Sequence, residues 1–240
     1  MIDFLGIGAQ KCGTYWLYEH LKGHPQIRFP AGKEIHFWDQ RRGRSAEQWM
    51  ALFPEAPGFQ QGEITPAYAL LNVEVISAVR VAAPSVKLFY SIRNPIARAW
   101  SSALMALGRA ELTIDEVSDQ WFIDHFESRG SRQRGGFLKC IENWLSVFPE
   151  DSLHLIVFDD LRDNPRHVLL LLAAHIGVDE LPFASADESK LRIPIFKGPD
   201  SNVRPSLLDY LRRIYIGEIR KMSGYLGRDF TAWTEWDGSR

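Results

Sequence analysis

Short apolar runs alternate along the chain with segments whose apolar residues recur at helical spacing. The runs predict strands, and the third is typical of a parallel strand buried on both faces; they span residues 2–7, 61–64, 86–92 and 153–158. The periodic segments predict helices; they span residues 14–21, 73–81, 95–107, 136–148, 165–176 and 205–226. This alternation predicts a three-layer α/β/α fold, in which helices flank a central parallel sheet and ligands bind at the carboxyl ends of its strands.

Composition points to one soluble globular domain. No internal repeat, low-complexity tract or Ser/Gly-rich linker divides residues 1–240, so we expect a single domain. The chain is 45% hydrophobic and 24% charged, which is ordinary for a globular protein. A domain of this size buries roughly 70% of its unfolded surface and needs neither a metal nor a disulfide to fold. Cys12 and Cys140 fit no metal-ligand spacing and are expected to be free thiols in a reducing compartment.

Charge and hydropathy exclude several kinds of partner. The formal net charge of −2 is far from the basic character of a general nucleic-acid-binding domain. No uncharged stretch approaches the roughly 18 residues that a membrane-spanning helix requires. Residues 1–4 lead directly into a strand pattern without a basic leader or a cleavage site. We therefore expect a cytoplasmic protein without nucleic-acid or membrane partners; the sequence does not predict its oligomeric state.

A candidate phosphate-binding loop of P-loop type lies between the first predicted strand and the first predicted helix. Residues 8–14 read Gly-Ala-Gln-Lys-Cys-Gly-Thr. A helix N-terminus offers unpaired N–H groups and a positive dipole end, and glycine lets the backbone approach an anion closely. The segment is not a Walker A motif, because Thr14 stands where that motif has its lysine and the lysine here is Lys11. A tight turn with an exposed lysine is the alternative.

A second candidate anion-binding pair follows the third predicted strand. Arg93 comes at the end of this strand, and Ser101 lies about two turns along the next predicted helix, roughly on the same face. Arg93 is otherwise a structural cap or one partner of an ion pair.

These segments resemble the nucleotide-binding motifs of sulfotransferases that use 3′-phosphoadenosine-5′-phosphosulfate (PAPS). Residues 4–17 resemble the loop that binds the 5′-phosphosulfate, whose usual pattern is Lys-x-Gly-Thr-[Thr/Ser]; this chain has Tyr15 in the last place. Residues 90–101 resemble the segment that binds the 3′-phosphate. The resemblance implies a set of PAPS-binding residues: Lys11, Cys12, Gly13, Thr14, Tyr15, Trp16, Arg93 and Ser101.

Further segments narrow the resemblance. Residues 32–38 resemble a Lys-Glu-x-His-Phe-Phe segment and residues 62–68 a Glu-Lys-[Ser/Thr]-Pro-x-Tyr segment, both typical of heparan sulfate 3-O- and N-sulfotransferases and their bacterial relatives. The second match implies that Glu63 is the catalytic base. Residues 196–198, followed by Arg204, resemble the loop that closes over the nucleotide, which adds Lys197 and Gly198 to the cofactor-binding residues. The similarity spans nearly the whole chain.

The implied activity is transfer of a sulfuryl group from PAPS to a hydroxyl or amine of a sugar-containing or small-molecule acceptor. Lys11 is suited to stabilise charge on the leaving phosphate, and Glu63 to accept the acceptor's proton. A sulfuryl group carries less charge than a phosphoryl group, so no metal ion is demanded. His36 is either a second base or acceptor contact, or a core histidine.

Two other functions remain open from the residues. A P-loop nucleotide kinase or NTPase would need a metal-binding acid at a strand end, and Asp159 and Asp160 supply one, although Lys11 is misplaced for that class. The second open function is a module that binds PAPS or another nucleotide but does not catalyse a reaction. The sequence also leaves open whether four aromatic residues stack on an acceptor or belong to the core; these are Phe37, Trp38, Trp49 and Tyr68.

Overall fold

The computed structural model describes residues 1–195 and 201–239, and their contacts group into two compact units. Unit 1 comprises residues 1–92 and 141–195. Unit 2 comprises residues 93–140 and 196–240. Each unit is described by itself.

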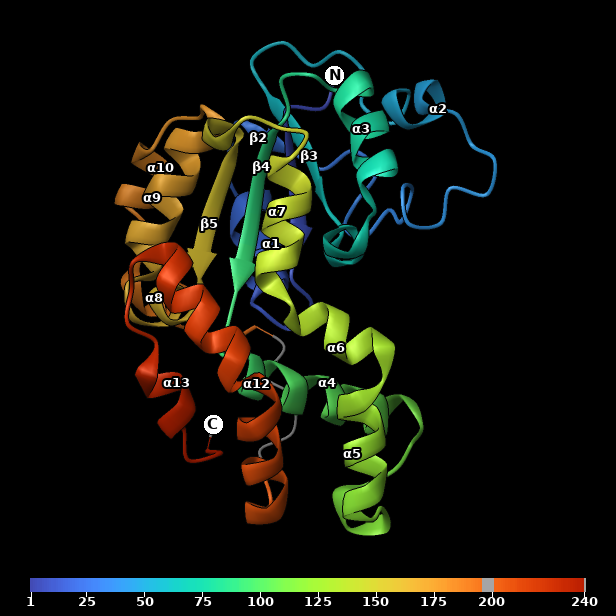
Figure 1. Ribbon diagram of the computed structural model, residues 1–240. Helices are drawn as coiled ribbons and strands as arrows, with labels where there is room; N and C mark the ends of the chain where they lie inside the picture. The colour runs from blue at the N-terminus through green and yellow to red at the C-terminus, as the bar shows by residue number, and fades with distance from the viewer. Residues whose placement is uncertain (196–200, 240) are drawn as a thin grey trace. The chain divides into compact units, whose positions relative to one another are not determined.

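Unit 1 contains a five-stranded parallel sheet with the order β2-β3-β1-β4-β5 (Figure 1). The strands are β1 (Phe4–Gly8), β2 (Ile27–Arg28), β3 (Gln60–Ile64), β4 (Lys87–Ile92) and β5 (Leu153–Val157). The chain adds β2 and β3 on one side of β1 and then β4 and β5 on the other. This reversal is the place where parallel α/β sheets bind their ligands, at the carboxyl ends of the strands.

Helices lie on both sides of this sheet (Figure 1). The helical elements of unit 1 are α1 (Thr14–Lys22), α2 (Ala46–Met50), η1 (Pro66–Leu70), α3 (Val73–Ala82), η3 (Glu150–Ser152), α8 (Phe158–Asp163), α9 (Pro165–Ile176), α10 (Leu181–Ala184) and α11 (Glu188–Leu191). Helix α7 (Phe137–Leu145) begins in unit 2 and ends in unit 1.

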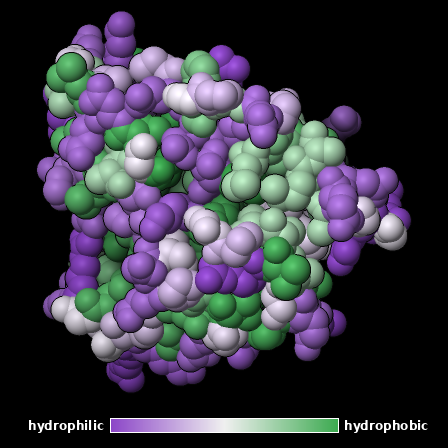
Figure 2. Space-filling model, turned by 90° about the horizontal axis from the view of Figure 1, so that it is seen from above, coloured by the Kyte–Doolittle hydropathy of each residue, from purple (hydrophilic) through white to green (hydrophobic). Residues whose placement is uncertain are grey.

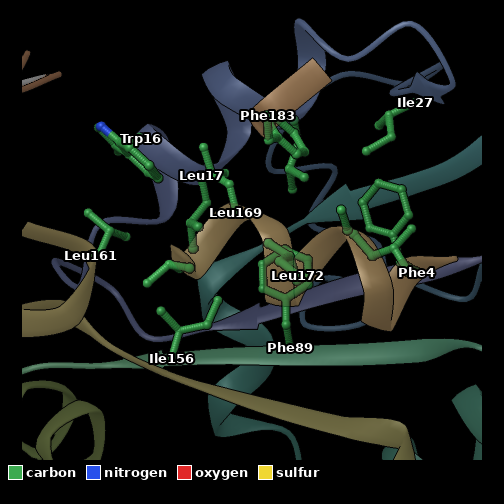
Figure 3. Packing of buried hydrophobic residues seen from close by; sticks show 14 of the residues in the cluster. Phe4, Trp16, Leu17, Ile27, Phe89, Ile156, Leu161, Leu169, Leu172 and Phe183 are labelled. Carbon is green, nitrogen blue, oxygen red and sulfur yellow. The ribbon is translucent and has the colours of Figure 1, made fainter. Parts of the chain in front are cut away.

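The core on one face of the sheet holds α1 and α9 against the strands. Phe4, Phe89 and Ile156 belong to β1, β4 and β5 and pack in one buried cluster with Leu17 of α1 and Leu172 of α9 (Figure 3). Burying side chains of this size stabilises a fold by about 1.5–3 kcal/mol each. The packing therefore fixes the N-terminus of α1 near the end of β1.

Unit 2 is helical in its described part. Its elements are α4 (Pro95–Arg109), η2 (Ile114–Glu116), α5 (Asp119–Glu127), α6 (Arg129–Gly135), α12 (Pro205–Leu226) and α13 (Thr231–Glu235). The fully buried Arg98 of α4 joins three of these helices, because its Nη2 donates to the Ser131 carbonyl of α6 (3.0 Å) and to the Tyr215 hydroxyl of α12 (3.3 Å). Asn94 caps α4 by accepting from the Ile96 amide (3.0 Å).

The observed elements confirm the predicted α/β class and the parallel sheet. Each predicted strand and helix is present with ends within a few residues, and α12 spans the predicted 205–226. The structure adds shorter elements that were not predicted. They include β2, which is too short to give a strand pattern, and α5 and α6, which fill a stretch for which no element was predicted. Hydrophilic residues interrupt the hydrophobic ones over the face seen in Figure 2. Across the described ranges, no helix combines the length and apolarity needed to cross a bilayer.

Candidate active site

The loop between β1 and α1 is tied to both neighbouring strands at the carboxyl end of the sheet. On the β4 side, the Ala9 amide donates to the Ser91 carbonyl (2.8 Å) and the Ser91 hydroxyl donates to the Cys12 carbonyl. On the β3 side, Gly8 has a φ of 141°, and a Cβ there would lie 3.0 Å from the Pro66 carbonyl oxygen. Glycine is therefore required at position 8 by both conformation and space.

The N-terminus of α1 presents backbone amides to a ligand. Gly13 has a φ of 83° and stands as the N-cap, and the first helical bond runs from the Leu17 amide to the Gly13 carbonyl (3.0 Å). The amides of Thr14, Tyr15 and Trp16 precede that bond, so helix geometry directs them toward an external acceptor. Lys11 lies half-buried just before them in the left-handed conformation, with a φ of 69°.

The side chains of Trp16 and Cys12 are buried and do not face a ligand at this loop. The Trp16 side chain is 6% exposed, belongs to the hydrophobic core and donates through Nε1 to the Leu191 carbonyl (3.1 Å). Only its backbone amide remains for an anion. The Cys12 side chain is fully buried, and its backbone amide donates to the Ala9 carbonyl (3.3 Å) within the loop.

Glu63 is the last residue but one of β3, and its carboxylate is fully enclosed. Its Oε1 accepts from Trp49 Nε1 (2.8 Å), its Oε2 accepts from the Thr65 hydroxyl (2.8 Å), and the Tyr68 hydroxyl lies 3.1 Å from Oε1. The residue is 0% exposed. Burial raises the pKa of Glu63 to about 7, against the three hydrogen bonds, which lower the pKa.

This pKa makes stability depend on pH. An unfolded glutamate titrates near 4.5 and Glu63 in the fold near 7, so the native state binds more protons between these values and the free energy of unfolding falls as pH rises from 4.5 to 7. We expect Glu63→Gln to abolish this fall in the free energy of unfolding, which amounts to about 3 kcal/mol between pH 4.5 and 7. Chemical denaturation of both proteins between pH 5 and 8 measures the difference.

The comparison with wild type isolates Glu63, because other groups titrate alike in both proteins. Burial lowers the pKa of His154 to about 4, for example, which changes stability in the opposite direction in both. The exposed Glu55 supplies a control, since Glu55→Gln should leave the pH dependence unchanged. Parallel curves for wild type and Glu63→Gln would contradict the expectation.

Residues 33–39 form a second polar group at the same end of the sheet, and this group is partly exposed. The Glu34 amide donates to the Ile64 carbonyl (3.0 Å), directly beyond Glu63. The side chains of Glu34 and His36 are 46% and 33% exposed, and His36 Nε2 lies 3.6 Å from Glu34 Oε2. His36 Nδ1 lies 2.8 Å from Asp39 Oδ2. His36 is therefore not a core histidine.

Lys33 connects this polar group to the loop of Lys11. Its ammonium group pairs with the Glu34 carboxylate and lies 5.4 Å from the centre of the Tyr15 ring in the first turn of α1. The structure thus brings the predicted residues Lys11, Tyr15 and His36 to one end of unit 1. The four aromatic residues left open by the sequence are core residues, at 0–2% exposure: Phe37, Trp38, Trp49 and Tyr68.

The remaining predicted cofactor residues lie in unit 2 or outside the described residues. Arg93 is half-buried and immediately precedes the cap of α4, and Ser101 is a 5%-exposed residue within α4. Lys197 and Gly198 lie outside the described residues. No group of three His, Cys, Asp or Glu side chains within residues 1–195 and 201–239 is arranged to hold a metal ion.

The sequence interpretation did not single out Glu34 and Asp39, whose carboxylates lie beside His36. Both stand in the segment that was singled out for His36, one residue after Lys33 and one after Trp38. The available signal was the presence of charged residues on both sides of the aromatic pair Phe37–Trp38, which is buried in the structure. The motif match had assigned the base to Glu63.

Comparison with known proteins decides the family. Residues 2–188 match the sulfotransferase domain family. The chain belongs to the sulfotransferase family. This match confirms the resemblance found in the motifs and removes the kinase alternative. That alternative would use Asp159 as the metal-binding acid. In the structure, Asp159 Oδ1 lies 3.6 Å from Arg162 Nη1, and β4 separates β5 from β1.

The relatives of this sulfotransferase include two mouse enzymes. The chain is 29% identical to heparan sulfate glucosamine 3-O-sulfotransferase 6 of Mus musculus, over 66% of this chain and 47% of that protein. It is 26% identical to heparan sulfate glucosamine 3-O-sulfotransferase 3A1 of Mus musculus, over 97% of this chain and 63% of that protein. The chain thus matches about half of the first relative's length.

Solved sulfotransferases share the fold and confirm the predicted P-loop-type class. A sulfotransferase from Alicyclobacillus acidocaldarius superposes with a TM-score of 0.74 at 24% identity, over 97% of this chain and 98% of that one. Mouse sulfotransferase SULT7A1, solved in complex with PAP, superposes with a TM-score of 0.58 at 16% identity, over 94% of this chain and 88% of that one.

Proposed function

We propose that this sulfotransferase moves the sulfuryl group of PAPS to a hydroxyl or amine of a sugar-containing or small-molecule acceptor. The observation that carries the proposal is the glycine-bounded loop with Lys11, which leads into the amide-presenting N-terminus of α1 at the carboxyl end of the central strand. Two relatives are named as sulfotransferases of heparan sulfate, a carbohydrate, which supports a sugar-containing acceptor. A structural neighbour was solved in complex with PAP, which supports PAPS as the donor.

Lys11 and the first amides of α1 bind the phosphosulfate in this proposal. The amides of residues 14–16 hold phosphate oxygens, and the Lys11 ammonium stabilises the negative charge that develops on the leaving phosphate oxygen as the sulfur–oxygen bond breaks. A point charge on a flexible stem is able to follow that oxygen through the reaction. Arg93 and Ser101 bind the 3′-phosphate, as the motif resemblance implies.

Exposure favours Glu34 over Glu63 as the group that removes the acceptor's proton. A general base must come within hydrogen-bond distance of that proton. Glu63 is 0% exposed and its carboxylate oxygens accept from three side chains, so an acceptor has no direct access to it. The Glu34 side chain is 46% exposed, with His36 beside it. We therefore assign the base to Glu34 and a positioning role to Glu63.

Binding of the product nucleotide tests the donor. We expect calorimetry to show far tighter binding of 3′-phosphoadenosine-5′-phosphate (PAP) than of AMP, because Arg93 and Ser101 make charge-assisted contacts to a phosphate that AMP lacks. Arg93→Ala should weaken PAP by about 2 kcal/mol or more, at least some 30-fold, and leave AMP nearly unchanged.

The control for this experiment is Arg109→Ala, which removes an exposed positive charge from the other end of α4. Equal binding of PAP and AMP, or an equal loss in both variants, would contradict the assignment of the 3′-phosphate to Arg93. Labelled PAPS with a panel of sugar and small-molecule acceptors then tests turnover, and binding without any transfer would favour a non-catalytic nucleotide-binding module.

A further inference from the structure

The Tyr68 hydroxyl joins the enclosed Glu63 to the exposed polar segment. Tyr68 lies in η1 and is 0% exposed. Its hydroxyl donates to Glu63, with Oε1 at 3.1 Å and Oε2 at 3.2 Å, and accepts from the Phe37 amide (3.1 Å) and the Trp38 amide (3.4 Å). One donated and two accepted bonds use the full capacity of a tyrosine hydroxyl.

The segment that receives this contact has an unusual backbone. Glu34 has a φ of 60° and His36 a φ of 53°, in the left-handed region that residues with a Cβ seldom adopt. Such conformations persist only where surrounding contacts hold them. The Glu34 amide is held by the Ile64 carbonyl (3.0 Å) on one side of the turn, and the amides of Phe37 and Trp38 are held by Tyr68 on the other.

Glu63 decides the direction in which the Tyr68 hydroxyl points. Trp49 Nε1 donates to one carboxylate oxygen and the Thr65 hydroxyl to the other, each at 2.8 Å, so the carboxylate is held at both ends. Above its pKa of about 7, the Glu63 carboxylate is ionised and only accepts hydrogen bonds, so it accepts the Tyr68 proton. The lone pairs of Tyr68 are then turned toward the two backbone amides.

We propose that Tyr68, oriented by Glu63, is the positioning residue that fixes the backbone after His36 and thereby aims the Glu34 and His36 side chains at the acceptor. This inference rests on the proposed function, in which Glu34 removes the acceptor's proton. Glu63 and Trp49 act one step further away, through Tyr68. Arg44 supports the same turn from outside, because its Nη2 donates to the His36 carbonyl (3.2 Å).

The main test is Tyr68→Phe, which removes the hydroxyl and keeps the ring. We expect the amides of Phe37 and Trp38 to exchange hydrogen at least about tenfold faster, since they lose their acceptor. We expect kcat to fall by about 10²-fold, because a displaced base loses its near-attack geometry. PAP affinity should stay unchanged, because the Tyr68 hydroxyl binds Glu63 and the amides of residues 37 and 38 rather than the loop of Lys11.

A matched pair of tryptophan variants controls for the loss of core volume. Trp49 and Trp144 are both 0% exposed, and both donate through Nε1. Trp49 donates to the Glu63 carboxylate, whereas Trp144 donates to the Tyr68 carbonyl (3.3 Å) and leaves the hydroxyl untouched. Trp49→Phe should accelerate exchange at positions 37 and 38, and Trp144→Phe should not.

Three results would overturn the inference: unchanged exchange at Phe37 and Trp38 in folded Tyr68→Phe, unchanged kcat in that variant, or equal effects of Trp49→Phe and Trp144→Phe. If Tyr68→Phe fails to fold, the tryptophan pair decides. The exchange measurement requires no substrate. A wild-type protein that transfers no sulfuryl group would therefore contradict the proposed function, while the hydrogen-exchange result still tests whether Tyr68 holds the segment.

Discussion

Replacing Glu34 by glutamine is expected to lower kcat by about 10²- to 10⁴-fold, the usual contribution of a general base. Glutamine keeps the shape of the side chain but cannot take the acceptor's proton. Because Glu34 is placed at the acceptor rather than at the nucleotide, the affinity for PAP should not change. The measurement is kcat with labelled PAPS on a preparation whose melting temperature and PAP affinity match those of wild type.

Glu63→Gln is the matched comparison for this experiment. As a positioning residue, Glu63 needs only to accept from Trp49 and Tyr68, and the glutamine carbonyl oxygen is able to do so. We expect kcat within about tenfold of wild type, well below the loss on removal of a base. A large loss of kcat in Glu63→Gln together with nearly full activity in Glu34→Gln would contradict this assignment. Glu63 would then be the base, as the motif alone implies.

Replacing Lys11 by alanine is expected to lower kcat by about 10²- to 10³-fold, comparable to removing one preorganised donor from an oxyanion site. The ammonium charge is most valuable when the leaving oxygen becomes negative, so it stabilises the transition state more than the bound substrate. PAP affinity should fall less than kcat. Steady-state kinetics together with calorimetry separates the two effects.

The control for Lys11 is Lys22→Ala, which removes an exposed charge at the far end of the same helix. It should leave kcat and PAP affinity nearly unchanged. A Lys11→Ala enzyme with normal kcat and only a raised KM would show that Lys11 binds the nucleotide without acting in the transfer step.

Local patterns predicted four of the five strands of the sheet and the helices α1, α3, α4, α7, α9 and α12. The helix over residues 205–226 could be predicted to the residue, because Pro205 begins it and Gly227, with a φ of 59°, ends it. The loop before α1 could be predicted for the same reason, since Gly8 and Gly13 adopt conformations that other residues avoid. The two-residue strand β2 could not, because it exists only through its pairing with β3.

The candidate site could be predicted only in part. Lys11 and the first amides of α1 follow one another in the chain, so the sequence by itself determined that an anion-binding loop opens the first helix, and its motifs determined the family. Tertiary structure alone decided which carboxylate is accessible. Glu63 is enclosed because Trp49 and Tyr68, which lie outside β3, pack over its carboxylate. Glu34 is exposed because it lies in a left-handed turn that hydrogen bonds to Ile64 and Tyr68 hold in place. Exposure depends on contacts between segments distant in sequence, which neither periodicity nor a motif records.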